Sequence, residues 1–235
     1  MTALITLSHG SRHSRAAEGV DRLTHAAARV AGISKFCSAH LEFNEPNLKS
    51  AADSLASLGV KEAVVVPLLF TSGYHQKIDV PTALRAAEDS SGLRLRRAPG
   101  LGTGEEMARV LARRMRKAYP EEHCILYAVG SSEPCANIAV EKLAIRVADL
   151  TGHSTSVAFA TRGGREAVAS QAAVYRRVRV LPLFVTTGLL LDLLSESPVH
   201  VDPPLGEDLA DIIAARFRAV ARTRPHAHKL VKNGI

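Results

Sequence analysis

The sequence predicts an α/β protein made of two similar domains, each a parallel sheet flanked by helices, and related by an internal duplication. Short apolar runs alternate with longer amphipathic runs along all 235 residues, which is the pattern of repeated strand–helix units. Three short motifs also occur twice, in the same order, once in each half. Because chance rarely produces three ordered repeats, both halves should share one fold.

The repeated motifs place the two halves in register. By residue number, the pairs are 7–12 with 127–132, 66–75 with 181–190, and 98–102 with 202–206. A chain of this length is long enough for two domains of ordinary size. We therefore expect domains over residues 1–120 and 121–222, followed by a basic tail over 223–235.

Local patterns predict the elements in order. Apolar runs predict four strands in each half, at 3–7, 35–43, 62–70, 93–97, 124–129, 154–160, 177–185 and 199–201. Amphipathic stretches between them predict helices at 15–30, 47–58, 80–89, 104–118, 135–150, 165–175 and 207–220. The runs 63–66 and 178–181 are β-branched and bounded by breakers, which is typical of buried central strands in a parallel sheet.

Composition narrows the classes of function. The net charge of +7 favours an acidic partner. Aromatic residues make up only 4% of the chain, and no helix-turn-helix or zinc-finger spacing occurs, so we expect no nucleic-acid partner. No apolar run approaches about 20 residues and no basic leader precedes the first strand, so we expect a cytoplasmic protein without a membrane partner. The three cysteines form neither a disulfide framework nor a metal motif.

Only the first copy of the repeat carries histidines at two of its positions. In the aligned motifs Val129 stands where His9 stands, and Leu190 stands where His75 stands. The shared residues therefore belong to the framework, and the two imidazoles are candidates for chemistry. Ligands of open α/β sheets bind beyond the carboxyl ends of strands, and both histidines follow predicted strands. If those strands are neighbours, about 5 Å apart, both side chains reach one pocket.

Two carboxylates belong to the same predicted edge, because Glu42 lies at the end of the second predicted strand and Glu45 just after it. Neutral imidazoles with a carboxylate suit a divalent ion such as Fe(II), Co(II), Ni(II) or Zn(II). A histidine also titrates near neutral pH and can accept a proton. The residues therefore predict metal and proton chemistry at this edge.

Three segments together resemble the class II chelatases of the sirohydrochlorin cobaltochelatase and ferrochelatase group. They are Ser8–Arg12, Glu42–Pro46 and Val66–His75, with Asp79 and Pro81 behind them. The resemblance covers most of the first half clearly. The second half resembles the family as a degenerate chelatase-like copy. It implies a lyase that inserts a divalent metal, Co²⁺ or Fe²⁺ with Ni²⁺ as a further candidate, into sirohydrochlorin without ATP. Such an enzyme serves siroheme or cobalamin biosynthesis.

The resemblance also implies residue roles. His9 and His75 would be catalytic and would bind the metal together with Glu42, and His9 would accept protons. The residues implied to bind the tetrapyrrole are Ser11, Arg12, Glu45, Leu68, Leu69, Phe70, Thr71, Ser72, Gly73 and Tyr74. Long family members can carry a cysteine cluster, which this chain lacks, so no iron–sulfur cluster is expected. Because the family acts without ATP, the resemblance implies no nucleotide cofactor.

Two other functions stay open at this point. A non-catalytic carrier of metal or tetrapyrrole would need the same ligands as a chelatase. A histidine phosphatase would also place His9-Gly10 after a strand, but it needs an arginine where Ser8 stands. Small members of the chelatase group pair as homodimers of half-length chains. Because this chain carries both units, we expect a monomer that binds one tetrapyrrole.

Overall fold

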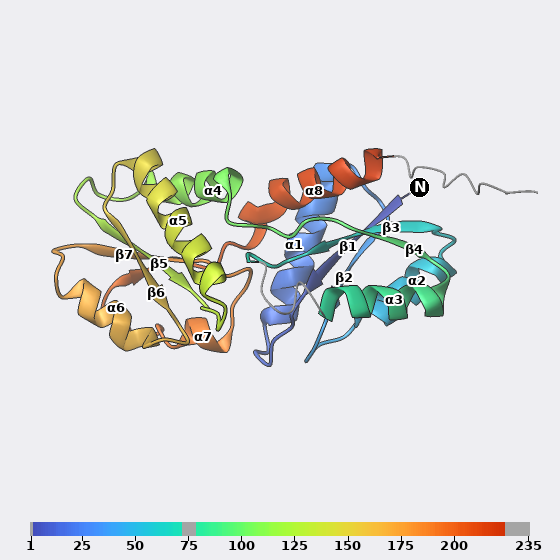
Figure 1. Cartoon of the computed structure of the whole chain (residues 1–235), viewed down its shortest axis with the longest axis horizontal. Coiled ribbons are helices and arrows are strands. Elements are labelled where there is room, and N and C mark those ends of the chain that lie inside the picture. Colours follow the sequence, from blue (N-terminus) through green and yellow to red (C-terminus); the bar gives the residue numbers. More distant parts are fainter. Residues whose placement is uncertain (1, 72–78, 224–235) are drawn as a thin grey trace, which may run out of the picture.

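The computed structural model describes residues 2–71 and 79–223, which contain two four-stranded sheets (Figure 1). The first sheet has the strand order β2-β1-β3-β4 and the second the order β6-β5-β7-β8. All neighbouring strands are parallel. The two sheets thus repeat one topology, which confirms the predicted α/β fold.

The strands lie where the apolar runs predict them. Their bounds are β1 (Thr2–Ser8), β2 (Phe36–His40), β3 (Glu62–Pro67), β4 (Arg94–Arg97), β5 (His123–Ala128), β6 (Thr155–Phe159), β7 (Val178–Pro182) and β8 (His200–Val201). Strands β3 and β7 end earlier than predicted, each at a proline, which has no N–H for the ladder. The residues after Pro67 and Pro182 are apolar because they line a cavity rather than because they pair in a sheet.

The helices also follow the prediction, with one addition. Their bounds are α1 (Ala16–Ala31), α2 (Leu48–Ser57), α3 (Val80–Ser91), α4 (Glu105–Met115), α5 (Pro134–Thr151), α6 (Gly164–Ala172), α7 (Leu189–Asp192) and α8 (Ala210–Arg222), which follows the 3-10 turn η2 (Gly206–Leu209). Helix α7 was not predicted, because four residues are too few to show a helical period. No helix in the described part of the chain is both long and apolar enough to cross a membrane.

The last helix of each half packs on the other half (Figure 1). Helix α4 follows the first sheet but packs against α5, whereas α8 follows the second sheet but packs against α1 and β3. One hydrophobic core therefore runs through both halves and contains residues of α1, α4, α5 and α8. The domain division at residue 120 describes the repeat along the sequence and remains a prediction.

Arg114 of α4 holds the segment that leads from the second sheet to α8. Its guanidinium donates to the carbonyl oxygens of Pro203, Pro204 and Leu205, and its Nε lies 2.8 Å from Asp208 Oδ2. Only 14% of the side chain is exposed. Hydrogen bonds of a largely buried charged group are among the stronger ones in proteins. Arg114 should therefore stabilise the arrangement in which α4 and α8 each pack on the opposite half.

We expect Arg114→Ala to lower the free energy of unfolding by about 2–3 kcal/mol, because the carbonyls lose a charged donor and Asp208 loses its cation. Urea unfolding followed by circular dichroism measures the change. Arg113→Ala, which removes the exposed neighbouring guanidinium on the same helix, is the matched control and should change stability little. Equal losses in the two variants would contradict this role for Arg114.

A buried histidine lies at the start of β5. The Nδ1 and Nε2 atoms of His123 lie 2.8 and 2.7 Å from the hydroxyl oxygens of Ser154 and Ser156, and its ring stacks on Tyr175. Burial lowers the pKa of His123 below its ordinary value of 6.5. Over a range of acidic pH, His123 is therefore neutral in the folded chain and protonated in the unfolded chain.

Stability should fall as the pH drops below 6.5, because the unfolded chain then binds a proton at His123 that the folded chain does not bind. Urea unfolding at about pH 7 and about pH 5 measures the loss. His123→Phe keeps a ring against Tyr175 but cannot titrate, so its loss should be smaller than that of the wild type. The same loss in both proteins would show that this imidazole does not carry the pH dependence.

Candidate active site

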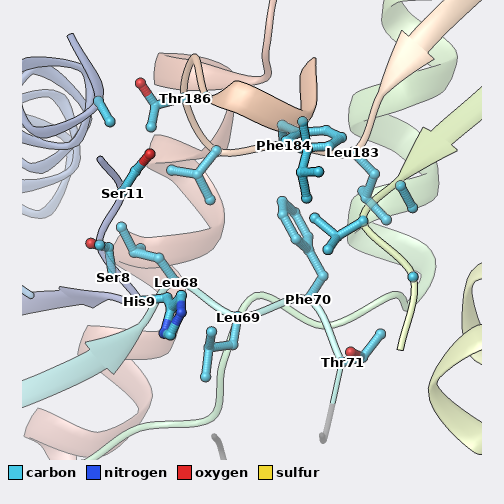
Figure 2. Close-up of a pocket in the computed structure, with 18 of the residues that line it drawn as sticks. Ser8, His9, Ser11, Leu68, Leu69, Phe70, Thr71, Leu183, Phe184 and Thr186 are labelled. Atoms are coloured by element: carbon cyan, nitrogen blue, oxygen red, sulfur yellow. The ribbon is translucent and has the colours of Figure 1, made fainter. Parts of the chain in front are cut away.

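A cavity of about 910 Å³ lies between the two halves, at the carboxyl ends of their central strands (Figure 2). The first half contributes residues 8–12 after β1 and residues 68–71 after β3. The second half contributes residues 128–133 after β5 and residues 183–190 after β7. Two pairs of repeated sequence motifs therefore meet around one shared cavity.

The loop that carries His9 lies directly on the loop after β2. Gly10 has a φ of +96°, and a Cβ added there would lie 1.8 Å from the carbonyl oxygen of Glu42. The N–H of Glu42 donates to the carbonyl of His9 at 2.9 Å, and the N–H of Ser11 donates to Asn44 Oδ1 at 2.8 Å. Because these contacts fix the backbone on both sides of Gly10, His9 is held at the cavity wall.

The second half repeats this backbone arrangement without the imidazole. Gly130 also has a positive φ, of +89°, and the N–H of Thr161 donates to the carbonyl of Val129 at 3.0 Å. Val129 and His9 both line the cavity. The described wall therefore carries an imidazole in one half and an aliphatic side chain at the corresponding place in the other, as the aligned motifs predict.

His40 is a second wall histidine, which the sequence patterns did not single out. The parallel register places it beside Ser8, and His40 Nδ1 lies 2.7 Å from Ser8 Oγ. Its side chain is buried, and burial lowers its pKa, while the charges of Asp21 and Glu45 act in the opposite direction. We infer a neutral imidazole beneath the cavity. The proximity of His40 to Ser8 follows from the strand register and is not visible in the sequence motifs.

Apolar side chains form much of the wall. Figure 2 shows Phe70 pointing between the halves toward Leu183 and Phe184, with Leu68 and Leu69 beside His9. Thr71 lies on the wall, whereas the predicted site residues Ser72, Gly73, Tyr74 and His75 lie outside the described residues. The described wall thus combines a broad apolar surface with polar side chains, as small-molecule sites do.

Arg12 is the one arginine or lysine on the described part of the wall. Its guanidinium carbon lies 4.9 Å from the centre of the Phe43 ring. Ser11 lies on the wall nearby, and Figure 2 shows Ser11 and Thr186 on one side of the cavity. An anionic group entering here would find one cation and several neutral hydroxyl groups.

The two predicted carboxylates do not reach this wall as described. Glu42 and Glu45 are both exposed, and Glu45 accepts hydrogen bonds from the backbone and side-chain nitrogens of Asn47 at 2.7 and 3.1 Å. No three His, Cys, Asp or Glu side chains group as a metal site within residues 2–71 and 79–223. His75 is outside these ranges, so a site of His9, His75 and Glu42 stays a prediction.

The two halves are also joined beside the cavity. His13 Nε2 of the first half lies 3.3 Å from Asp192 Oδ2 at the end of α7, and the N–H of Arg15 donates to His13 Nδ1 at 3.1 Å. Helix α7 begins within the wall segment 183–190, at Leu189. This contact therefore links the loop of His9 to the wall of the opposite half.

Solved structures share this fold. SirB from Bacillus subtilis with Fe³⁺ superposes with a TM-score of 0.76 at 21% sequence identity, covering 94% of this chain and 96% of that one. At this identity the likeness concerns the fold alone. The overall fold therefore has a precedent in a chain of similar extent.

The chain also has relatives in sequence, which share part of its length. A sirohydrochlorin cobaltochelatase of Sulfurisphaera tokodaii is 40% identical over 77 residues, which are 33% of this chain and 62% of the relative's own length. One of Saccharolobus solfataricus is 34% identical over 90 residues, which are 35% of this chain and 70% of that protein. The family model named CbiX matches residues 3–118. The chain therefore belongs to the CbiX family.

Proposed function

We propose that this chain inserts a divalent metal, Co²⁺ or Fe²⁺, into sirohydrochlorin without ATP, as a step of siroheme or cobalamin biosynthesis. The observation that carries the proposal is the shared cavity with the imidazole of His9 on its wall. The names of the relatives, sirohydrochlorin cobaltochelatase, support it. The metal is a substrate of this reaction, and histidine ligands accept several divalent ions.

Metal insertion has two chemical requirements that imidazoles meet. Water must leave the ion, and two pyrrole protons must leave the macrocycle. A neutral imidazole can bind the ion or accept a proton, but its one free lone pair cannot do both at once. We therefore assign catalysis to the pair His9 and His75. Both bind the metal, with Glu42 as a third ligand, and His9 accepts a proton at a stage of the reaction in which its lone pair does not hold the ion.

The wall suits a flat apolar ring with anionic edges. Leu68–Phe70 and the facing residues Leu183 and Phe184 would contact the ring, which is favourable because apolar surface leaves water. Arg12 would pair with a carboxylate of the substrate, and the Ser11 and Thr71 hydroxyls would donate to others. On the basis of the family resemblance, we also assign substrate binding to Glu45, Ser72, Gly73 and Tyr74.

We further propose that one chain works alone and binds one tetrapyrrole, because both halves of a single chain already line the cavity. We propose the cytoplasm as its location. The reaction as proposed uses no nucleotide and no iron–sulfur cluster, and it involves neither nucleic acid nor a membrane. A carrier without activity would bind sirohydrochlorin and metal at the same place but would not exceed the uncatalysed rate of insertion.

Replacing His9 or His75 by Ala should lower the rate of Co²⁺ insertion about a hundredfold or more, because each variant loses a metal ligand or proton acceptor. The absorption change of sirohydrochlorin on metal insertion measures the rate, against the rate without protein. His25→Ala is the matched control, because His25 is exposed on α1 and is not on the described wall. If both single variants kept rates within a few-fold of the wild type, the site assignment would be wrong.

A further inference from the structure

Phe43 has an unusual backbone conformation for a bulky residue. Its φ is +63°, and it is the one non-glycine residue with a positive φ among those the structure describes. L-residues avoid this region because Cβ crowds the neighbouring carbonyl. The residue is nevertheless 51% exposed and lies on the cavity wall. The conformation is therefore not adopted to bury the ring in a core.

Hydrogen bonds on both sides of Phe43 hold this conformation. The N–H of Asn44 donates to the carbonyl of Glu42 at 2.8 Å, which closes a three-residue turn of the γ type around Phe43. Glu42 N–H donates in turn to the carbonyl of His9, and Asn44 Oδ1 accepts from the N–H of Ser11. The turn is thereby fixed directly to the loop that carries His9.

The ring contacts two functional side chains of that loop. The imidazole of His9 lies with its centre 6.0 Å from the ring centre of Phe43 and at 87° to it, a favourable edge arrangement. The guanidinium carbon of Arg12 lies 4.9 Å from the same ring centre, within the range of a cation–π contact. One ring therefore touches the candidate metal ligand and the one described cation of the wall.

The first half, which carries His9, has an aromatic side chain at position 43, but the equivalent position of the second half has none. The backbone bonds from Glu42 to His9 and from Thr161 to Val129 make Glu42 and Thr161 equivalent. Arg162 then stands where Phe43 stands, and no residue of 159–163 is on the described cavity wall. The second half thus lacks both the imidazole and its aromatic neighbour.

We propose that Phe43 is a positioning residue that holds the His9 imidazole and the Arg12 guanidinium in one fixed arrangement. This inference rests on the proposed function. A metal at His9 and a carboxylate at Arg12 would then belong to the same bound tetrapyrrole, one at its centre and one at its edge. The left-handed backbone is retained because it directs the ring to both side chains.

Replacing the ring separates positioning from stability. Phe43→Gly removes the ring and suits a φ of +63°, so its thermal unfolding midpoint should equal or exceed that of the wild type. Its kcat/KM for Co²⁺ insertion should nevertheless fall about tenfold, through a lower kcat from His9 and a higher KM from Arg12. Phe43→Leu should lose similar activity without the gain in stability, and Phe43→Tyr should stay within about twofold.

Leu58→Ala is the matched control, because it shortens another exposed apolar side chain, which lies at the end of α2 and does not line the described cavity. It should keep wild-type kinetics. A merely structural role for Phe43 predicts activity that follows stability, so a glycine variant with wild-type kcat and KM would overturn the proposal.

Titration with Co²⁺ alone separates this inference from the proposed function. The visible absorption of bound Co²⁺ reports metal binding without any tetrapyrrole, so it is informative even if the wild type proves to be a carrier. Phe43→Gly should weaken Co²⁺ binding about threefold or more, because the imidazole is no longer held in place. Equal affinity for Co²⁺ in Phe43→Gly and the wild type would overturn the positioning role.

Discussion

The backbone of Gly10 lies so close to the carbonyl of Glu42 that no side chain fits between them. This contact brings the loop after β1 onto the loop after β2, and three features of the site follow from it. Glu42 can donate to the carbonyl of His9, Ser11 can donate to Asn44, and the turn at Phe43 lies beside the imidazole. A single position without a Cβ thus determines where the candidate ligand, the cation and the aromatic ring meet.

The duplication explains why one cavity has two unlike sides. Both halves keep a glycine with positive φ after their first strand and the same strand order, so they present equivalent loops to a common space. Helices α4 and α8 each pack on the opposite half, and the apolar core is continuous between the halves. One chain thus forms both walls of the cavity, and within residues 2–71 and 79–223 the histidines on these walls, His9 and His40, belong to the first half.

Local patterns were sufficient to predict most of the fold. Strand and helix periods depend on nearby residues, and the repeated motifs brought His9 and Val129 to the same cavity, as expected from strand ends in parallel sheets. The exchange of α4 and α8 depends on packing between distant segments, which a helical period does not encode. Likewise His40 reaches Ser8 through strand register, and Phe43 reaches His9 through a γ-type turn, and neither is visible as spacing in the sequence.

The central claim is that the two unlike halves of one chain form one complete site. Native mass spectrometry of the chain with sirohydrochlorin tests it directly, because each peak reports the number of chains and of bound tetrapyrroles together. The account predicts a single chain carrying one tetrapyrrole, with no further binding as the ligand concentration rises. Two tetrapyrroles on one chain, or binding only to a pair of chains, would contradict it.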